Sequence, residues 1–473
     1  MRAVLIAASF LNPLKHLKTN PYPLLLRKLN DYKNQSKSMS KRILYWLQND
    51  LRLTDNPIFS DLMLQQCALD IVFVINPHWF KNNNYQQKPY GIHKQQFLLQ
   101  SLYELQQALI ERGQTLHVLE GDPVSLLKAR INEQNINEVV YSEQFGLYEQ
   151  RQINLLKAHC PNTQFTGSQQ DTLFKQSELP FDLSELPKHF TPFRKKVEAA
   201  NNPITPTTLP NGLLPQPITL CAKKPIEPIT NKGVMHGGLN SAQAHLKQYF
   251  TGAMPSTYKI TRNELDGFNN TTKFSTWLAF GCLSAKQVYK AVEDYEQSNT
   301  ANESTYWIKF ELLWREYFKW HALKAGSSLF SFKGQKQTKP LTTFTPTRFA
   351  AWCNGTTPYP LVNAIMKELN ITGYISNRAR QIAASCLVNE LGLDWRYGAA
   401  YFEQQLIDYD VAANWGNWQY IAGVGVDPRG GRHFNIEKQT QQFDPESIYI
   451  KKWGGDQSAN AQLDHLNEVD WPI

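Results

Sequence analysis

The chain of 473 residues is long enough for about two or three domains, and its 42% apolar content is typical of a soluble globular protein. No apolar run reaches membrane-spanning length, and the six cysteines stand singly without a CxxC pair, so nothing signals a membrane span, a zinc site or a disulfide framework. The net charge of +8 is concentrated in residues 1–38, where seven Lys or Arg against one Asp give +6 and leave only +2 for the rest.

Residues 1–38 are rich in Leu, Lys and Asn, and they precede Met39, which stands just before the first expected strand. Two interpretations remain open. The segment is either an over-extended start, with Met39 as the true first residue, or a basic segment that targets the chain to an organelle. We favour the first interpretation and expect a cytoplasmic protein.

From residue 40 to residue 170 the chain alternates strand patterns with helical patterns. Strands are expected at 43–48, 69–75, 116–119, 138–141 and 164–166, and helices at 93–112, 124–134 and 149–159. This alternation predicts an α/β domain with a doubly wound parallel sheet. No GxGxxG follows the first strand, so the usual dinucleotide fingerprint is absent.

Residues 171–235 are rich in Pro, Thr and Asn, and we expect an inter-domain linker that runs over the surface. Strand signals disappear after Gly237. Helices are expected at 241–250, 284–295, 304–325, 361–370, 374–391, 397–407 and 411–421. Residues 236–453 are therefore predicted to form an all-α domain, followed by a polar tail at 454–473.

The stretch 408–420 is unusual because two Asp, two Asn and two Trp fall within it. If the chain is helical from Val411, Asn414 and Trp418 share one face. Such a face suits a flat, polar, aromatic ligand. The alternative is an aromatic helix packed in a core, with its Asp residues as caps.

Three further segments carry polar side chains in positions that fit a binding site. On the helix at 304–325, Glu311 lies in an aromatic stripe and must be functional or paired, for example with Arg315. Near the start of the helix at 374–391, two amides four residues apart share a face, and they are either solvent-exposed or turned into a cavity. Residues 271–275 precede an apolar helix, which suits phosphate binding or an ordinary helix cap.

Together these segments resemble the photolyase/cryptochrome family and, within it, the cryptochrome DASH branch. The resemblance extends over residues 40–453 in many ordered motifs, among them WLQNDLRLTDNP at 46–57, TTKFSTWLAFGCLS at 271–284, STYWIKFELLWREYF at 304–318, TGYISNRARQIAAS at 372–385 and DYDVAANWGNWQYIAGVGVDPR at 408–429. It implies an α/β antenna domain and a helical FAD-binding domain in a DNA repair flavoprotein. Such proteins use blue light to cleave cyclobutane pyrimidine dimers.

Positions carried over from the family imply the residues that bind FAD. These are Tyr258, Thr271, Thr272, Lys273, Phe274, Ser275, Arg380, Asp408, Tyr409, Asp410 and Asn414. The resemblance places residues 271–275 at the phosphates, pairs Arg380 with Asp408, and turns Asn414 towards flavin N5. It also implies a 5,10-methenyltetrahydrofolate antenna contacted by Glu149, and no metal site is expected.

The same resemblance implies DNA contacts from Arg262, Glu311, Trp314, Asn377, Arg378, Gln381, Tyr420 and Gln439. Glu311 is expected to bond the base edge of the dimer and Asn377 a base carbonyl, while Trp314 and Tyr420 flank its faces. Relatives that repair duplex DNA usually carry Trp and Met where Tyr420 and Gln381 stand. We therefore expect a monomeric protein that prefers single-stranded DNA.

Photoreduction in the family passes along three tryptophans. Trp418 matches the inner one and Trp395 the middle one, and both are counted with Glu311, Asn377 and Asn414 as the catalytic set. The outer position is Thr342, so the expected path lacks its last member. The alternative function is a blue-light photoreceptor or transcriptional regulator with little repair turnover.

Overall fold

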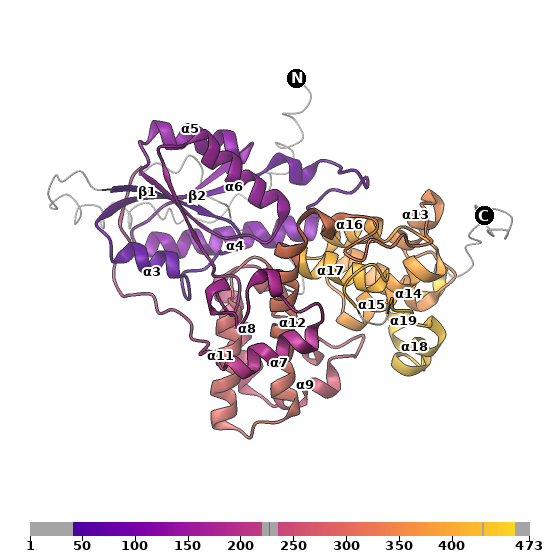
Figure 1. Ribbon diagram of the computed structural model, residues 1–473. Coiled ribbons are helices and arrows are strands. Elements are labelled where there is room, and N and C mark those ends of the chain that lie inside the picture. The colour runs from indigo at the N-terminus through magenta and orange to yellow at the C-terminus, as the bar shows by residue number, and fades with distance from the viewer. Residues whose placement is uncertain (1–40, 220–226, 228–234, 428–429, 459–473) are drawn as a thin grey trace.

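The computed structural model describes residues 41–219, 227, 235–427 and 430–458, in an α/β part followed by a helical part (Figure 1). Both interpretations of residues 1–38 lie outside the described residues, as does most of the predicted polar tail. Within the described ranges, no helix is both long enough and apolar enough to cross a bilayer.

The α/β part is built on a parallel sheet with the strand order β3-β2-β1-β4-β5, which confirms the predicted doubly wound arrangement. The strands are β1 (Lys41–Leu47), β2 (Cys67–Ile75), β3 (Leu116–Glu120), β4 (Glu138–Ser142) and β5 (Gln164–Ser168), and a short β6 (Gln216–Pro217) pairs with β2. All five strands expected from the sequence are present.

Helices cover both faces of this sheet, because alternate residues of β1 enter two different cores. Ile43 and Tyr45 pack with α4, whereas Leu44 and Trp46 pack with α5 and α6. Figure 1 shows α3 and α4 on one side of the sheet and α5 and α6 on the other. The helices are α3 (Pro57–Met63), α4 (Ile92–Glu111), α5 (Pro123–Glu133) and α6 (Leu147–His159).

The helical part contains every helix expected after residue 237, and the prediction of an all-α second half is confirmed. The helices there are α8 (Leu239–Thr251), α9 (Met254–Thr261), α10 (Ser275–Ala279), α11 (Ala285–Ser298), α12 (Glu303–Ala325), α13 (Pro346–Asn354), α14 (Pro360–Thr372), α15 (Asn377–Ser385), α16 (Trp395–Gln405), α17 (Val411–Ile421), α18 (Ile436–Phe443) and α19 (Ile448–Lys452). The expected helix at 374–391 is α15 continued by a π-helical turn, Cys386–Glu390.

The segment expected to be a linker contains a helix that the sequence analysis missed, α7 (Phe190–Ala200). Phe190, Phe193 and Val197 are buried at helical spacing, and α7 packs against α12. The Pro- and Asn-rich surroundings concealed this short apolar pattern. Part of the segment 171–235 is therefore packed structure rather than a plain connection.

Helix α12 joins the two parts of the molecule through the buried carboxyl of Glu316. This group accepts backbone hydrogen bonds from Leu173 at 2.8 Å and Phe174 at 3.3 Å, just beyond β5, and one from the indole of Trp320 at 2.8 Å. Burial raises the pKa of Glu316 to about 7, although these donors act against it. The chain leaving the sheet is thus fastened to α12.

The raised pKa of Glu316 predicts a pH-dependent loss of stability. The folded chain binds this proton more tightly than the unfolded chain, so the contribution of Glu316 to stability falls as the pH rises from about 4.5 through about 7. In Glu316→Gln the side chain at this position does not ionise. The melting temperature of this variant, relative to that of the parent, should therefore rise as the pH is raised from about 5 to about 8. Glu303→Gln, at an exposed position of α12, is the control, and parallel curves for Glu316→Gln and the parent would contradict the prediction.

Candidate functional site

The start of α17 is held by a buried cluster of ionised side chains. Asp410 caps the helix by accepting from the backbone N–H of Ala413 at 2.9 Å, and its other oxygen accepts from Lys319 at 2.7 Å. Lys319 also contacts Asp171, which pairs with Arg315. Burial favours the neutral form of Asp410, but the charges of Lys319 and Arg315 outweigh it and hold the pKa at about 2. Asp410 is therefore ionised and fixes α17 to α12.

Asp408, two residues before this cap, presents an oxygen that lacks a partner. Its Oδ2 accepts from Arg380 on α15 at 2.8 Å, the pairing that the resemblance implies. Its Oδ1 is buried and has no hydrogen-bond partner among the described residues. Because a buried acceptor without a donor is costly, this atom suits the N–H group of a bound ligand.

The turn before α10 holds a buried cation. Lys273, in a left-handed conformation with φ +55°, donates to the hydroxyl of Thr271 at 2.7 Å and lies over the ring of Tyr374 at 4.7 Å. No carboxylate of the described residues forms an ion pair with it. Phe274 is buried beside it, whereas Ser275 is exposed and the carbonyl of Thr272 accepts from His245 at 2.8 Å. A buried ammonium that makes no direct ion pair with a carboxylate of the described residues suits an anionic ligand such as a phosphate.

A second buried cluster lies where α4 and α6 meet the helical part. Lys94 of α4 donates to the carbonyl of Glu403 at 2.8 Å, and its ammonium lies over the rings of Tyr90 and Tyr409. Burial raises the pKa of Glu149 and of Glu403 and lowers that of Lys94. Tyr409, expected with Asp408, thus turns towards this cluster instead, where its hydroxyl accepts from Trp415 at 3.1 Å.

On the outer side of α12, Glu311 combines a charge with an aromatic setting. Its carboxylate accepts from Arg262 at 2.6 Å and from the indole of Trp307 at 3.2 Å. Burial raises the pKa of Glu311, with Arg262 acting against it. Tyr258, on the neighbouring α9, is also buried. Glu311 is thus paired, but with Arg262 and not with Arg315, which the sequence offered as an example and which is engaged with Asp171.

The aromatic rings near Glu311 touch one another. Trp314 and Tyr420 meet edge to face at 6.2 Å, and Phe190 of α7 stacks on Trp314 with ring centroids 3.7 Å apart. The cation of Arg432 lies 5.5 Å from the centre of the Tyr420 ring. Two rings expected from the sequence are thus adjacent, and a third comes from the segment that was expected to be a linker.

The expected DNA contacts on α15 and α18 are placed with different exposure. Asn377 is exposed at the start of α15, and Gln381 is half-buried one turn later. The guanidinium of Arg378 donates to Asn263 at 3.2 Å and lies over the ring of Phe443, and its Nε is buried without a partner among the described residues. The Oε1 of Gln439 on α18 is also buried without one.

Trp418 and Trp395 are both buried, but they contact different rings. Trp418 meets Trp352 and Phe402, whereas Trp395 meets Trp415 at 5.7 Å. The Trp418 ring fills the space beside Gly398, where an added Cβ would lie 2.2 Å from its Cη2 atom. Nearby, the amide of Asn414 donates to the carbonyl of Ala399 at 3.0 Å, and the Thr342 hydroxyl is buried without a partner among the described residues.

Several of these groups escaped the sequence analysis. Lys94, Lys319, Asp171 and Glu403 belong to the buried clusters, yet their partners lie far away along the chain. A signal exists for Lys319, because it is one of several ionisable residues on the otherwise apolar and aromatic helix α12. Among the described residues, no group of His, Cys, Asp and Glu could hold a metal ion.

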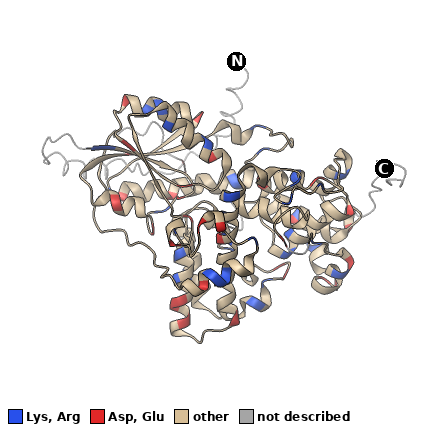
Figure 2. Ribbon diagram, viewed as in Figure 1, with Lys and Arg blue, Asp and Glu red and all other residues tan. Residues whose placement is uncertain are grey.

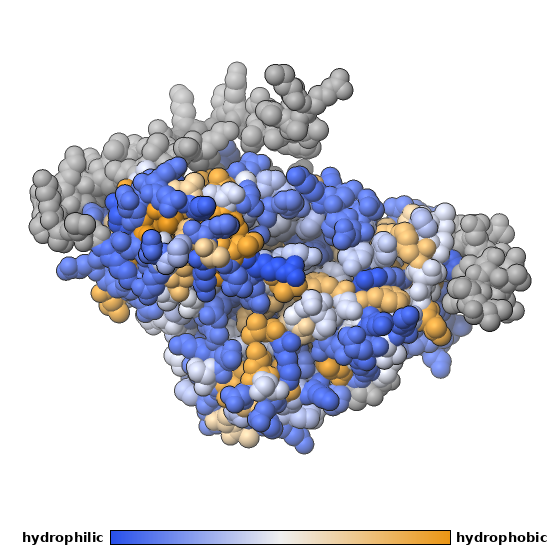
Figure 3. All heavy atoms as spheres, turned by 45° about the horizontal axis from the view of Figure 1, so that its top comes forward, coloured by the Kyte–Doolittle hydropathy of each residue, from blue (hydrophilic) through white to orange (hydrophobic). Residues whose placement is uncertain are grey.

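The distribution of charged and apolar residues indicates which groups can bind a polyanion. Acidic and basic side chains are interspersed along both parts of the molecule (Figure 2). The face in Figure 3 is mainly hydrophilic, with apolar residues in separate patches. Binding of a polyanion therefore depends on local groups, among them Arg262, which pairs with Glu311, and Arg378 on α15.

Comparison with protein families covers most of the chain. Residues 43–211 match the DNA photolyase family, and residues 307–461 match the FAD binding domain of DNA photolyase. The second match includes most of α12 and all of α15 and α17, and with them Arg380 on α15 and Asp408 and Asp410 just before α17.

Two similar proteins are named cryptochrome DASH. The chain is 48% identical over 435 residues to a protein named cryptochrome DASH from Idiomarina loihiensis. The aligned region covers 91% of this chain and 96% of the relative. It is 46% identical over 442 residues to one so named from Vibrio parahaemolyticus, with 92% and 98% covered. The crystal structure of a Synechocystis cryptochrome matches with a TM-score of 0.83 and 38% identity, covering 88% of this chain and 89% of that one.

The ion cluster predicts that Lys319 is indispensable to the fold. In Lys319→Met the carboxylates of Asp171 and Asp410 stay buried without their shared cation, which should cost about 3–5 kcal/mol of unfolding free energy. Lys324→Met, on the same helix but with its ammonium bonded to a carbonyl, should cost much less. Chemical denaturation followed by tryptophan fluorescence measures both, and equal losses would contradict the prediction.

Proposed function

This chain belongs to the photolyase/cryptochrome family, in its cryptochrome DASH branch, and we propose that it splits cyclobutane pyrimidine dimers under blue light with FAD as cofactor, preferentially in single-stranded DNA. The observation that carries the proposal is Glu311. A partly buried carboxyl, paired with Arg262 and bonded to Trp307, precedes Trp314 by one helical turn, and Trp314 in turn meets Tyr420, which suits the recognition of a polar base edge between aromatic faces.

The residues of the helical part fit two parts of an FAD molecule, its phosphates and its flavin ring. The ammonium of Lys273 offers a buried cation for the phosphates, and Thr271 orients it. The free Oδ1 of Asp408 can accept from a flavin N–H, while the ion pair with Arg380 holds this carboxylate in place. When bound, FAD supplies the light-driven electron transfer that opens the cyclobutane ring.

The role of the protein is then to hold the damaged base. Glu311 accepts from the base edge, and Trp314 and Tyr420 provide apolar surface that excludes water. Asn377 and Gln381 add amide groups from α15, while Arg262, Arg378 and Gln439 are proposed to contact the DNA backbone. Trp418 is proposed as the inner electron donor to the cofactor and Trp395 as the middle one.

A preference for single strands follows from the side chains at two positions. A base in a duplex must be unstacked before it reaches the site, at a cost of about a few kcal/mol. Tyr420 and Gln381 offer less apolar contact than Trp and Met would offer, so less binding energy is available to meet this cost. A base in a single strand needs little of that energy.

The cluster around Glu149 supports a further part of the proposal. Lys94 is buried, and Glu149 and the ring of Tyr90 are partly buried, at the junction of the two parts, which suits a planar, polar pterin. We propose 5,10-methenyltetrahydrofolate as the antenna there and a monomer as the working unit.

Repair of defined oligonucleotides tests the function. Under blue light the reduced protein should restore a single-stranded oligonucleotide carrying one thymine dimer faster than the same dimer in a duplex. Glu311→Ala should lower the rate on single strands roughly ten- to a hundredfold, because the hydrogen bond between the base edge and this carboxyl group is lost. Glu303→Ala is the control, and equal rates on both substrates would disprove the preference, while no repair would disprove the function.

Lys273 predicts how firmly the cofactor is held. Lys273→Met removes the buried cation and should weaken FAD binding roughly ten- to a hundredfold. The purified variant should show a lower ratio of flavin to protein absorbance than Lys247→Met, an exposed lysine of α8. Unchanged flavin content in Lys273→Met would show that this cation does not hold the phosphates.

A further inference from the structure

The segment that leads into α7 is fastened to one face of α12 by three side chains. Tyr317 donates to the carbonyl of Lys188 at 2.6 Å, His321 bonds that of Pro187 at 2.9 Å, and Lys324 donates to that of Ser184 at 2.7 Å. The residues at 317, 321 and 324 follow helical spacing, so they lie along one face. The segment 184–189 is therefore held in place by α12.

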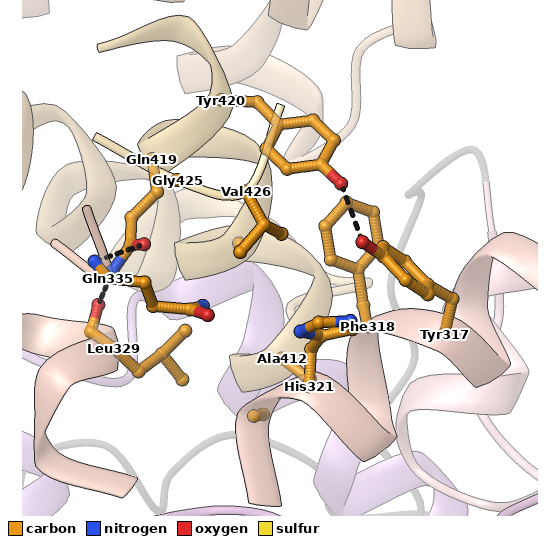
Figure 4. A pocket seen from close by; sticks show the side chains of 12 residues that line it. Tyr317, Phe318, His321, Leu329, Gln335, Ala412, Gln419, Tyr420, Gly425 and Val426 are labelled. Atoms are coloured by element: carbon orange, nitrogen blue, oxygen red, sulfur yellow. Dashed lines mark hydrogen bonds between the residues drawn. The ribbon is translucent and has the colours of Figure 1, made fainter. Parts of the chain in front are cut away.

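One of these three side chains also reaches a residue of the proposed DNA site. The hydroxyl of Tyr420 donates to that of Tyr317 at 3.3 Å, and Figure 4 shows the two hydroxyl groups pointing towards each other. Tyr317 is fully buried, and burial raises its pKa, so its hydroxyl keeps the proton that it donates to Lys188. A chain of hydrogen bonds thus leads from Tyr420 to the backbone of the segment before α7.

Packing alone does not fix the Tyr420 ring on this side. A cavity of about 10 Å³, enough for roughly one water molecule, lies next to it. It is lined by Tyr317, Phe318, His321, Gln335, Gln419 and Tyr420, among others (Figure 4). Because there is open space beside the ring, the directional bond to Tyr317 has an orienting role.

The segment that leads into α7 also supports Trp314, the ring that meets Tyr420. Phe190 directly follows the fastened residues and stacks on Trp314, with an angle of 10° between the ring planes. Tyr317 meets both rings edge to face, at 5.7 Å from each. Phe190 and Tyr317 thus hold the ring of Trp314, and Tyr317 holds that of Tyr420.

We propose that Tyr317 is a positioning residue for substrate binding, which acts by orienting Tyr420 through their hydroxyl groups. This inference rests on the proposed function, in which Tyr420 contacts the pyrimidine dimer. A ring already held at its binding angle loses less freedom when the base arrives, so the bond between the hydroxyls increases affinity without touching the DNA.

A double-mutant cycle in the dark tests this role without any turnover. The parent, Tyr317→Phe, Tyr420→Phe and the double variant are titrated by fluorescence anisotropy with a single-stranded oligonucleotide that carries one thymine dimer. Each single variant should bind about three- to tenfold more weakly, and the double variant no more weakly than either one. Binding of the undamaged oligonucleotide should not change.

The outcomes separate this inference from the function on which it rests. Tyr295→Phe removes another buried hydroxyl, bonded to Ser256 on α9, and should leave the affinity unchanged. If the effects of Tyr317→Phe and Tyr420→Phe multiply, or if Tyr317→Phe has no effect, the positioning role is overturned while the function stands. If the parent protein does not distinguish damaged from undamaged DNA, the proposed function fails, and the role of Tyr317 fails with it.

Discussion

The ammonium of Lys319 lies between two carboxylates from distant parts of the chain, Asp171 just after β5 and Asp410 at the start of α17. Its charge attracts both carboxylates where water is largely excluded, and together with Arg315 it holds the pKa of Asp410 at about 2 despite burial. Asp410 can then cap α17, the helix that carries Asn414, Trp418 and Tyr420. The candidate site therefore depends on an ion cluster that also joins the sheet to the helices.

Helix α12 connects the functions that we assign to different regions. One face carries Glu311 and Trp314 towards the proposed substrate. Other faces hold the ends of two neighbouring segments, through Glu316 to residues 173 and 174 and through Tyr317 to residue 188. Because so many positions of α12 make these contacts, few of them are free to change. Ionisable and aromatic residues therefore stand along α12 where aliphatic residues would be usual.

The sequence predicts what local spacing controls. The alternation of strands and helices yields the parallel sheet, and positions four apart place Trp307 against Glu311. Partners far apart along the chain escape this logic: Lys319 and Asp171 are separated by 148 residues. The family resemblance supplies the pair Arg380–Asp408 but not the turn of Tyr409 towards Lys94, because a motif fixes which residues occur and not where each side chain points.

The contact between Gly398 and Trp418 has a consequence for how this chain can change over generations. The indole occupies the volume that any side chain at 398 would need, with 2.2 Å between the ring and an added Cβ. A larger residue at 398 is acceptable only together with a smaller one at 418. Positions 398 and 418, on separate helices, are therefore expected to change together. Alanine or serine can appear at 398 only in relatives in which a smaller residue replaces Trp418.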